Sequence, residues 1–142
     1  MKTRAELLRF VRYCIVGCIN TLLTLCVIFV SKSYLGINPY VSNVTGYAVG
    51  LANSFLWNRS WVFHAGGGLR PQALRFLIGF AICYGLQFTL VWGLTQGSFG
   101  SREFDLGPMV LSGYGIATLA GNVLYTVCNF AYNRLVTFRP AR

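Results

Sequence analysis

Four long stretches of the chain carry no charged side chain, and this constrains the fold more than any other feature. Residues 13–31, 33–58, 76–101 and 106–133 are these stretches. Each exceeds the roughly 18 apolar residues that make a membrane-spanning helix plausible. A chain of 142 residues that is 55% hydrophobic and 11% charged has too much surface to bury that apolar content in a soluble core. The sequence therefore predicts an all-α membrane protein with four transmembrane helices, at about residues 10–30, 39–57, 74–94 and 108–132.

The distribution of Lys and Arg predicts how these helices are oriented. Of the 12 cations, only Lys32 and Arg102 fall in the two loops on one side, and the others fall at the termini and within or directly beside the loop 60–74. The positive-inside rule places the cation-rich side in the cytoplasm, and with it both termini. The first apolar run is longer than that of a signal peptide, so we expect it to be retained. Cations dispersed over membrane edges, rather than gathered on one soluble face, argue against a nucleic-acid partner.

The two halves of the chain end in similar sequence motifs, called the closing phrases below. Residues 55–63 read FLWNRSWVF and residues 130–138 read FAYNRLVTF, at an offset of 75. Each half also opens with an arginine and an aromatic residue, Arg12-Tyr13 and Arg75-Phe76, at an offset of 63. These echoes indicate a duplicated two-helix unit. We expect one domain over residues 1–142, made of a first repeat at about 8–64 and a second at about 74–138, with both repeats parallel in the membrane.

Small residues recur at four-residue spacing in the second and fourth predicted helices. Such stripes let helix backbones approach closely in lipid. We expect them to pack the second helix on the fourth, with a homodimer face as the alternative. The stripes are Gly46, Gly50 and Ser54, and Gly113, Ala117 and Gly121.

Polar side chains within the spans are the candidate site, because each is costly in hydrocarbon unless it is satisfied or functional. Amides flank an arginine at the cytoplasmic end of each half, and guanidinium groups bind phosphate through a bidentate fork. The alternative is that these arginines are topology anchors beside an aromatic belt of Trp57, Trp61 and Tyr132. The candidate site residues are Arg59, Arg134, Asn53, Asn58, Asn129 and Asn133 at the ends, Asn20 and Gln87 at mid-span, and the opening Arg12 and Arg75.

Residue types needed for common enzyme chemistry are missing from the spans. The only carboxylates, Glu6, Glu103 and Asp105, lie outside the uncharged stretches, and the only histidine, His64, lies in a loop. Nothing resembles a buried acid/base pair. The five cysteines show no disulfide spacing and are expected to pack as small apolar residues. We therefore expect no enzyme activity, no metal and no cofactor.

The opening and closing motifs resemble those of the GtrA-like family, which includes the membrane domain of some dolichol-phosphate mannose synthases. Residues 12–21 (RYCIVGCINT) fit the family pattern Arg-Phe-x-x-x-Gly-x-x-Asn-Thr, and residues 58–63 (NRSWVF) fit its closing motif. The resemblance covers about residues 8–138. The second repeat departs from the pattern at Ala81, Ile82, Leu135 and Val136, so the two halves need not have equal roles.

The resemblance implies a role in cell-surface polysaccharide synthesis. Family members are thought to move a polyprenyl-phosphate-linked sugar across the cytoplasmic (inner) membrane, where membrane glycosyltransferases use it. This function needs a cation at the entry leaflet and a polar route between helices, which the candidate residues can supply. The alternative is a non-transporting scaffold that recruits or stabilises such a glycosyltransferase. A drug/proton exporter is disfavoured, because no carboxylate lies within a span. Membrane lipids and a second copy of the chain, forming a homodimer, are the other expected partners.

Overall fold

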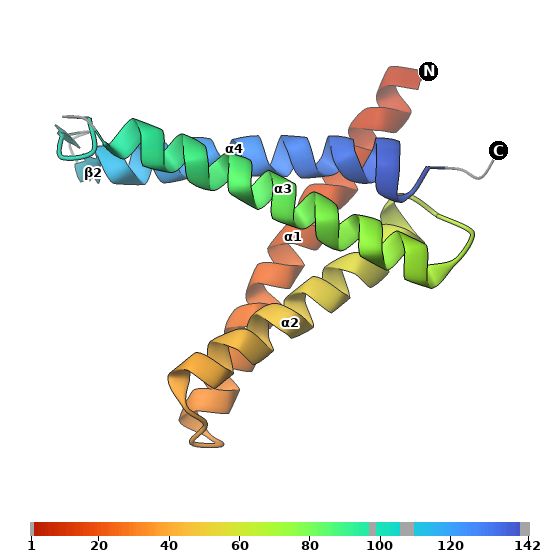
Figure 1. The fold of residues 1–142 in the computed structure, drawn as a ribbon, viewed down its shortest axis with the longest axis horizontal. Coiled ribbons are helices and arrows are strands. Elements are labelled where there is room, and N and C mark those ends of the chain that lie inside the picture. Colours follow the sequence, from red (N-terminus) through yellow and green to blue (C-terminus); the bar gives the residue numbers. More distant parts are fainter. Residues whose placement is uncertain (1, 97–98, 106–109, 140–142) are drawn as a thin grey trace. The chain divides into compact units, whose positions relative to one another are not determined.

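The computed structural model describes residues 2–96, 99–105 and 110–139. It divides into two compact units, the first ending at Gly67 and the second covering Gly68–Arg139. In each unit two long helices pack along each other, α1 with α2 and α3 with α4 (Figure 1). The structure is therefore mostly helical, with four long helices in the described part of the chain.

The first unit contains α1 (Lys2–Ser33) and α2 (Pro39–Trp57). α1 begins well before residue 10, because residues 4–9 are strong helix formers and Arg9 Nη1 donates to Glu6 Oε1 at 2.9 Å one turn away. The charged turns mark the predicted membrane edge and not the start of the helix. α2 has the bounds expected from the sequence. Asn38 caps it by accepting from the Tyr40 N–H at 2.9 Å, and Pro39 occupies its first turn.

Both units end their second helix in a π-helical turn, η1 (Asn58–Val62) and η2 (Asn133–Thr137). The N–H of Phe63 donates to Asn58 O at 2.9 Å, and the N–H of Phe138 donates to Asn133 O at 2.8 Å. Each bond joins residues five apart, one more than in an α-helix, so the helix is wider there. The widening occurs at the same position in the two closing phrases. Turns of this kind are rare and occur frequently at functional sites.

The second unit contains α3 (Leu69–Thr95) and α4 (Gly113–Tyr132), joined through two short strands. β1 (Glu103–Asp105) pairs antiparallel with β2 (Val110–Ser112), with Glu103 opposite Ser112. The expectation that the last helix runs from residue 108 is wrong over 110–112, and Pro108 itself lies outside the described residues. Residues 110–112 pair with β1 instead, and the Ser112 hydroxyl then caps α4 by accepting from the Gly115 N–H at 3.1 Å.

The exterior of both units is rich in large apolar side chains, and few residues are buried. Leu22, Val44 and Val123 are each more than 60% exposed, whereas the small core includes Val16 and Val62 in the first unit and Phe76 and Phe138 in the second. α1 (over Arg4–Ser33) and α3 are long and apolar enough to cross a membrane, the only two such helices among the residues described. Helices form their backbone hydrogen bonds internally, so helices with an apolar exterior are suited to the hydrocarbon interior of a membrane.

The glycine stripes pack inside each unit, so the expected packing of the second helix on the fourth is wrong. A Cβ on Gly46 would lie 2.5 Å from Ile28 Cγ1, and one on Gly121 would lie 2.7 Å from Val91 Cγ2. Gly46 and Gly50 therefore face α1, Gly121 faces α3, and Gly113 faces Phe99 and Gly100 in the loop that follows α3. This also removes them as a homodimer face, because a stripe covered by its own unit cannot contact a second copy. The spacing of small residues shows that one face of a helix allows close approach, but not which helix packs against that face.

Candidate functional site

Two cations of the first unit are held at η1. The Arg12 guanidinium lies over the Trp61 ring, with Cζ 5.6 Å from the ring centroid, and Trp61 packs edge-on against Trp57 at 6.0 Å. Arg59 is half-buried, and its Nη2 donates to Gly67 O at 3.0 Å. A guanidinium over an indole is the strongest of the common cation–π pairs. The first unit therefore presents two positioned arginines at one helix end.

The corresponding arginines of the second unit are arranged differently. Arg75 and Arg134 are both exposed. The residue at the position of Trp61 is Val136, which offers no ring for a cation. The stacking of an arginine on an aromatic ring at this turn is therefore a feature of the first unit, in keeping with the departure of the second repeat from the family pattern.

Asn58 and Asn133 open the π-helical turns and are buried to 1% and 0% exposure. The Nδ2 of Asn58 donates to Ser54 O at 2.8 Å and to Ser54 Oγ at 3.2 Å. The Nδ2 of Asn133 donates to Asn129 Oδ1 at 3.2 Å. Neither Oδ1 accepts a hydrogen bond from the described residues. Their amides thus brace the helix end, which fits a positioning role better than direct contact with a ligand.

Asn129 continues this bracing along α4. Its Nδ2 donates to the Tyr125 hydroxyl at 3.2 Å, and the Tyr125 ring packs edge-on against Phe80 of α3 at 6.2 Å. Tyr125, Asn129 and Asn133 therefore form a line of polar groups one helical turn apart. Asn129 is buried to 4% exposure, so this line lies inside the second unit.

Amides pair across the helices of each unit, and Asn53, which was expected to act at the helix end, meets the mid-span Asn20 instead. Asn53 Nδ2 of α2 donates to Asn20 Oδ1 of α1 at 2.6 Å, and Gln87 Nε2 of α3 donates to Asn122 Oδ1 of α4 at 2.7 Å. Interhelical amide bonds satisfy groups that hydrocarbon cannot. Asn122 is a polar residue of the fourth predicted span that was not among the predicted site residues, and only the packing of α3 on α4 reveals that it meets Gln87.

The two amide pairs do not occupy equivalent positions. Offsets of 63 and 75 relate Asn20 and Asn53 to Cys83 and Cys128, so the second unit has thiols where the first has amides. All five cysteines are free thiols. Among residues 2–96, 99–105 and 110–139, no group of three or more His, Cys, Asp or Glu side chains is placed to hold a metal ion. The polar features of the two units are therefore distinct in chemistry as well as in place.

Comparison with known proteins identifies the family. Residues 12–139 match the family model described as GtrA/DPMS, transmembrane domain. The uncharacterized membrane protein YngA of Bacillus subtilis (strain 168) is 29% identical over 131 residues, which are 89% of this chain and 77% of the relative.

Two further relatives have names that state an activity. A prophage bactoprenol-linked glucose translocase homolog of Escherichia coli (strain K12) is 24% identical, and the bactoprenol-linked glucose translocase of Shigella phage SfV is 25% identical. Each alignment covers 133 residues, 94% of this chain and 97% of the relative. Both are named as translocases and not as enzymes, which agrees with the expectation that this chain is no enzyme. The resemblance seen in the opening and closing motifs is confirmed, and the chain is a membrane protein that belongs to the GtrA/DPMS transmembrane domain family.

Proposed function

We propose that the protein translocates a polyprenyl-phosphate-linked sugar across the cytoplasmic membrane for the synthesis or modification of a cell-surface polysaccharide. The observation that carries the proposal is the match over nearly the whole chain to relatives named as bactoprenol-linked glucose translocases. Glucose carried on bactoprenol is accordingly the first substrate to test.

The proposed topology has all four helices crossing the membrane, in two parallel repeats with both termini cytoplasmic. α2 has 19 residues and α4 has 20, close to the roughly 20 that a spanning helix needs. Equivalent contacts support the duplication, since Gly46 meets Ile28 and Thr24 of α1 as Gly121 meets Val91 and Gln87 of α3. The same offsets of 63 and 75 relate both sets.

The lipid phosphate is proposed to enter at η1. Arg12 and Arg59 are the cations fixed there, and guanidinium forms charge-assisted bonds to phosphate oxygens. Asn58, and in the second unit Asn129 and Asn133, hold the helix ends in shape, and Arg75 and Arg134 add positive charge at the same proposed membrane face. The amide pairs offer hydrogen bonds to a polar headgroup within the apolar helices. No carboxylate lies inside the four predicted spans, so the transport is not coupled to proton exchange. The lipid-linked sugar instead equilibrates between the leaflets, and its consumption on the far side drives the net movement.

Arg59→Ala tests the entry site in cells. Because the variant loses the guanidinium, we expect delivery of the sugar to the surface glycan to be abolished while the amount of protein in the membrane is unchanged. Arg59→Lys keeps the charge but not the fork, so partial delivery is expected. Normal delivery by Arg59→Ala would remove Arg59 from the site.

Purified protein in proteoliposomes tests translocation itself. We expect a labelled polyprenyl-phosphate hexose to reach the opposite leaflet faster than in empty liposomes. Folded protein that gives no acceleration would instead favour the scaffold alternative, in which the chain serves a membrane glycosyltransferase, and co-purification of that partner would be the next experiment.

A further inference from the structure

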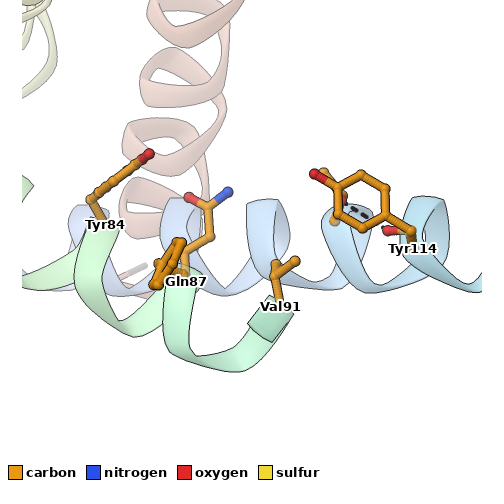
Figure 2. Close-up of a pocket in the computed structure, with 6 residues that line it drawn as sticks. Tyr84, Gln87, Val91 and Tyr114 are labelled. Atoms are coloured by element: carbon orange, nitrogen blue, oxygen red, sulfur yellow. Dashed lines mark hydrogen bonds between the residues drawn. The ribbon is translucent and has the colours of Figure 1, made fainter. Parts of the chain in front are cut away.

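A pocket of about 150 Å³ lies between α3 and α4 of the second unit. Its wall is formed by Tyr84, Gln87, Phe88 and Val91 of α3 and by Tyr114 and Thr118 of α4. Figure 2 shows the side chains of Tyr84, Gln87 and Tyr114 on the same side of the helix pair. The pocket is distinct from the arginines and amides at the helix ends.

The polar groups of this pocket are costly for a helix pair that lies in lipid. α3 is apolar enough to span the membrane, yet it carries an amide and a phenol here, and Tyr84 and Tyr114 are 55% and 59% exposed. Polar side chains inside a span face partners, cavities or substrates by default. An alkyl chain in this pocket could form no hydrogen bond with the amide or the phenols, so hydrocarbon is a poor occupant.

The amide of Gln87 is oriented by its neighbour. Its Nε2 donates to Asn122 Oδ1 at 2.7 Å, which uses one N–H and leaves the carbonyl oxygen and the second N–H to the pocket. The Thr118 hydroxyl donates to Tyr114 O at 2.8 Å, so its oxygen can still accept. The pocket therefore offers both donors and acceptors in fixed positions, as ligand sites with a few placed polar groups do.

Size and charge identify the part of a lipid-linked sugar that fits. The pocket is open on one side, and its volume of about 150 Å³ matches that of an enclosed cavity that binds benzene, a single six-membered ring. None of the six lining residues is charged, so a phosphate would lie there without a counter-charge. A neutral pyranose ring has apolar faces for the rings of Tyr84, Phe88 and Tyr114, and a rim of hydroxyls for the amide and the hydroxyl groups.

The first unit lacks this pocket chemistry. The offsets that relate the two halves place Thr24 and Tyr47 at the positions of Gln87 and Asn122. A Cβ on Gly50 would collide with the Thr24 hydroxyl, so Thr24 is held against α2. The amide pair that orients the pocket is therefore a property of the second unit.

We propose that this pocket binds the neutral hexose ring of the lipid-linked sugar, with Gln87 and Tyr84 as the residues that select for it. The proposal rests on the proposed function for the identity of its ligand.

Photo-cross-linking on the full-length protein in proteoliposomes tests the pocket without requiring transport. Benzoylphenylalanine in place of Phe88 is irradiated with tritiated polyprenyl-phosphate glucose. We expect labelling that is displaced by the unlabelled glycolipid but not by polyprenyl phosphate without sugar. Gln87→Leu is expected to weaken apparent binding about tenfold, as loss of one or two hydrogen bonds does.

Two further variants keep the test interpretable. Gln87→Leu also breaks the bond to Asn122, so Tyr84→Phe, which removes only an exposed hydroxyl, is measured beside it and is expected to weaken binding about threefold. Thr89→Val is the matched control, since among the described residues the Thr89 hydroxyl bonds only to Gly85 O, at 2.9 Å, and Thr89 does not line the pocket. Its binding is expected to be unchanged.

The possible outcomes distinguish a failure of the sugar-binding proposal from a failure of the proposed translocation. Equal displacement by the sugar-free lipid, or binding unaffected in both Gln87→Leu and Tyr84→Phe, would overturn the pocket even if the wild-type protein moves the lipid. Sugar-dependent labelling that Gln87→Leu reduces would support the pocket even if the wild-type protein moves no lipid, in which case translocation alone would fail.

Discussion

Replacing Gly46 by alanine would place a methyl group directly against α1. The added Cβ would lie 2.5 Å from Ile28 Cγ1 and 3.0 Å from the backbone oxygen of Thr24. Carbon atoms pack best at about 3.5–4.0 Å, so the helices must separate by about 1 Å or Ile28 must leave its rotamer. The Thr24 contact is with backbone, which a side-chain rotation cannot relieve.

The expected cost follows from this overlap. Forcing one extra methyl into a well-packed contact destabilises a protein by about 1–3 kcal/mol. Alanine also forms helix better than glycine by about 1 kcal/mol, and this gain must be subtracted. Gly17→Ala in α1 supplies the control, because a Cβ there would meet nothing within 4 Å. The difference between the two variants isolates the contact, and we expect Gly46→Ala to be less stable than Gly17→Ala by about 1–3 kcal/mol.

Reversible unfolding in mixed micelles with increasing SDS measures this difference, followed by far-UV circular dichroism and tryptophan fluorescence. Gly17→Ala should unfold at or above the SDS fraction of the wild type, and Gly46→Ala below it. Equal midpoints for the two variants would refute the reasoning, because α2 would then not approach α1 as closely as the structure shows.

Two other contacts of the first unit can be tested by substitution. A double-mutant cycle with Asn20→Leu and Asn53→Leu should give a coupling energy of about 0.6–1.7 kcal/mol in the same SDS titration, the range of interhelical hydrogen bonds in membranes; a coupling near zero would contradict the bond. Trp61→Leu removes the ring beneath Arg12 and should slow glycolipid movement about two- to fivefold, the equivalent of one exposed cation–π contact. Trp61→Phe retains a ring face and should stay closer to the wild type, so equal rates in the two variants would exclude this role for Trp61.

Local signals in the sequence predicted much of the fold. Pro39 after Asn38 marks the start of α2, because proline suits a first helical turn and asparagine suits the cap. The motifs around Arg12 and Asn58 identify the family, and the family match confirms the membrane character of the chain. These features depend on neighbours along the chain, which a sequence displays directly.

Features that depend on contacts between helices were beyond the sequence. The partner of Gln87 is Asn122, and this pairing is set by the rotation of α4 against α3. The glycine stripe at Gly46 and Gly50 faces α1, although its spacing alone is equally compatible with another helix or a second copy. The π-helical turns after Trp57 and Tyr132 were also missed, because the residues at each helix end are compatible with an ordinary α-turn.

The central claim is that this chain alone carries a lipid-linked sugar across a bilayer. The most direct measurement is the fraction of labelled bactoprenyl-phosphate glucose that becomes accessible in the opposite leaflet as the number of protein copies per vesicle is raised. If the protein is a translocase, this fraction rises from the single-leaflet value to near completeness once every vesicle holds protein. A fraction that stays at the value of protein-free vesicles, with the protein folded and inserted, would contradict it.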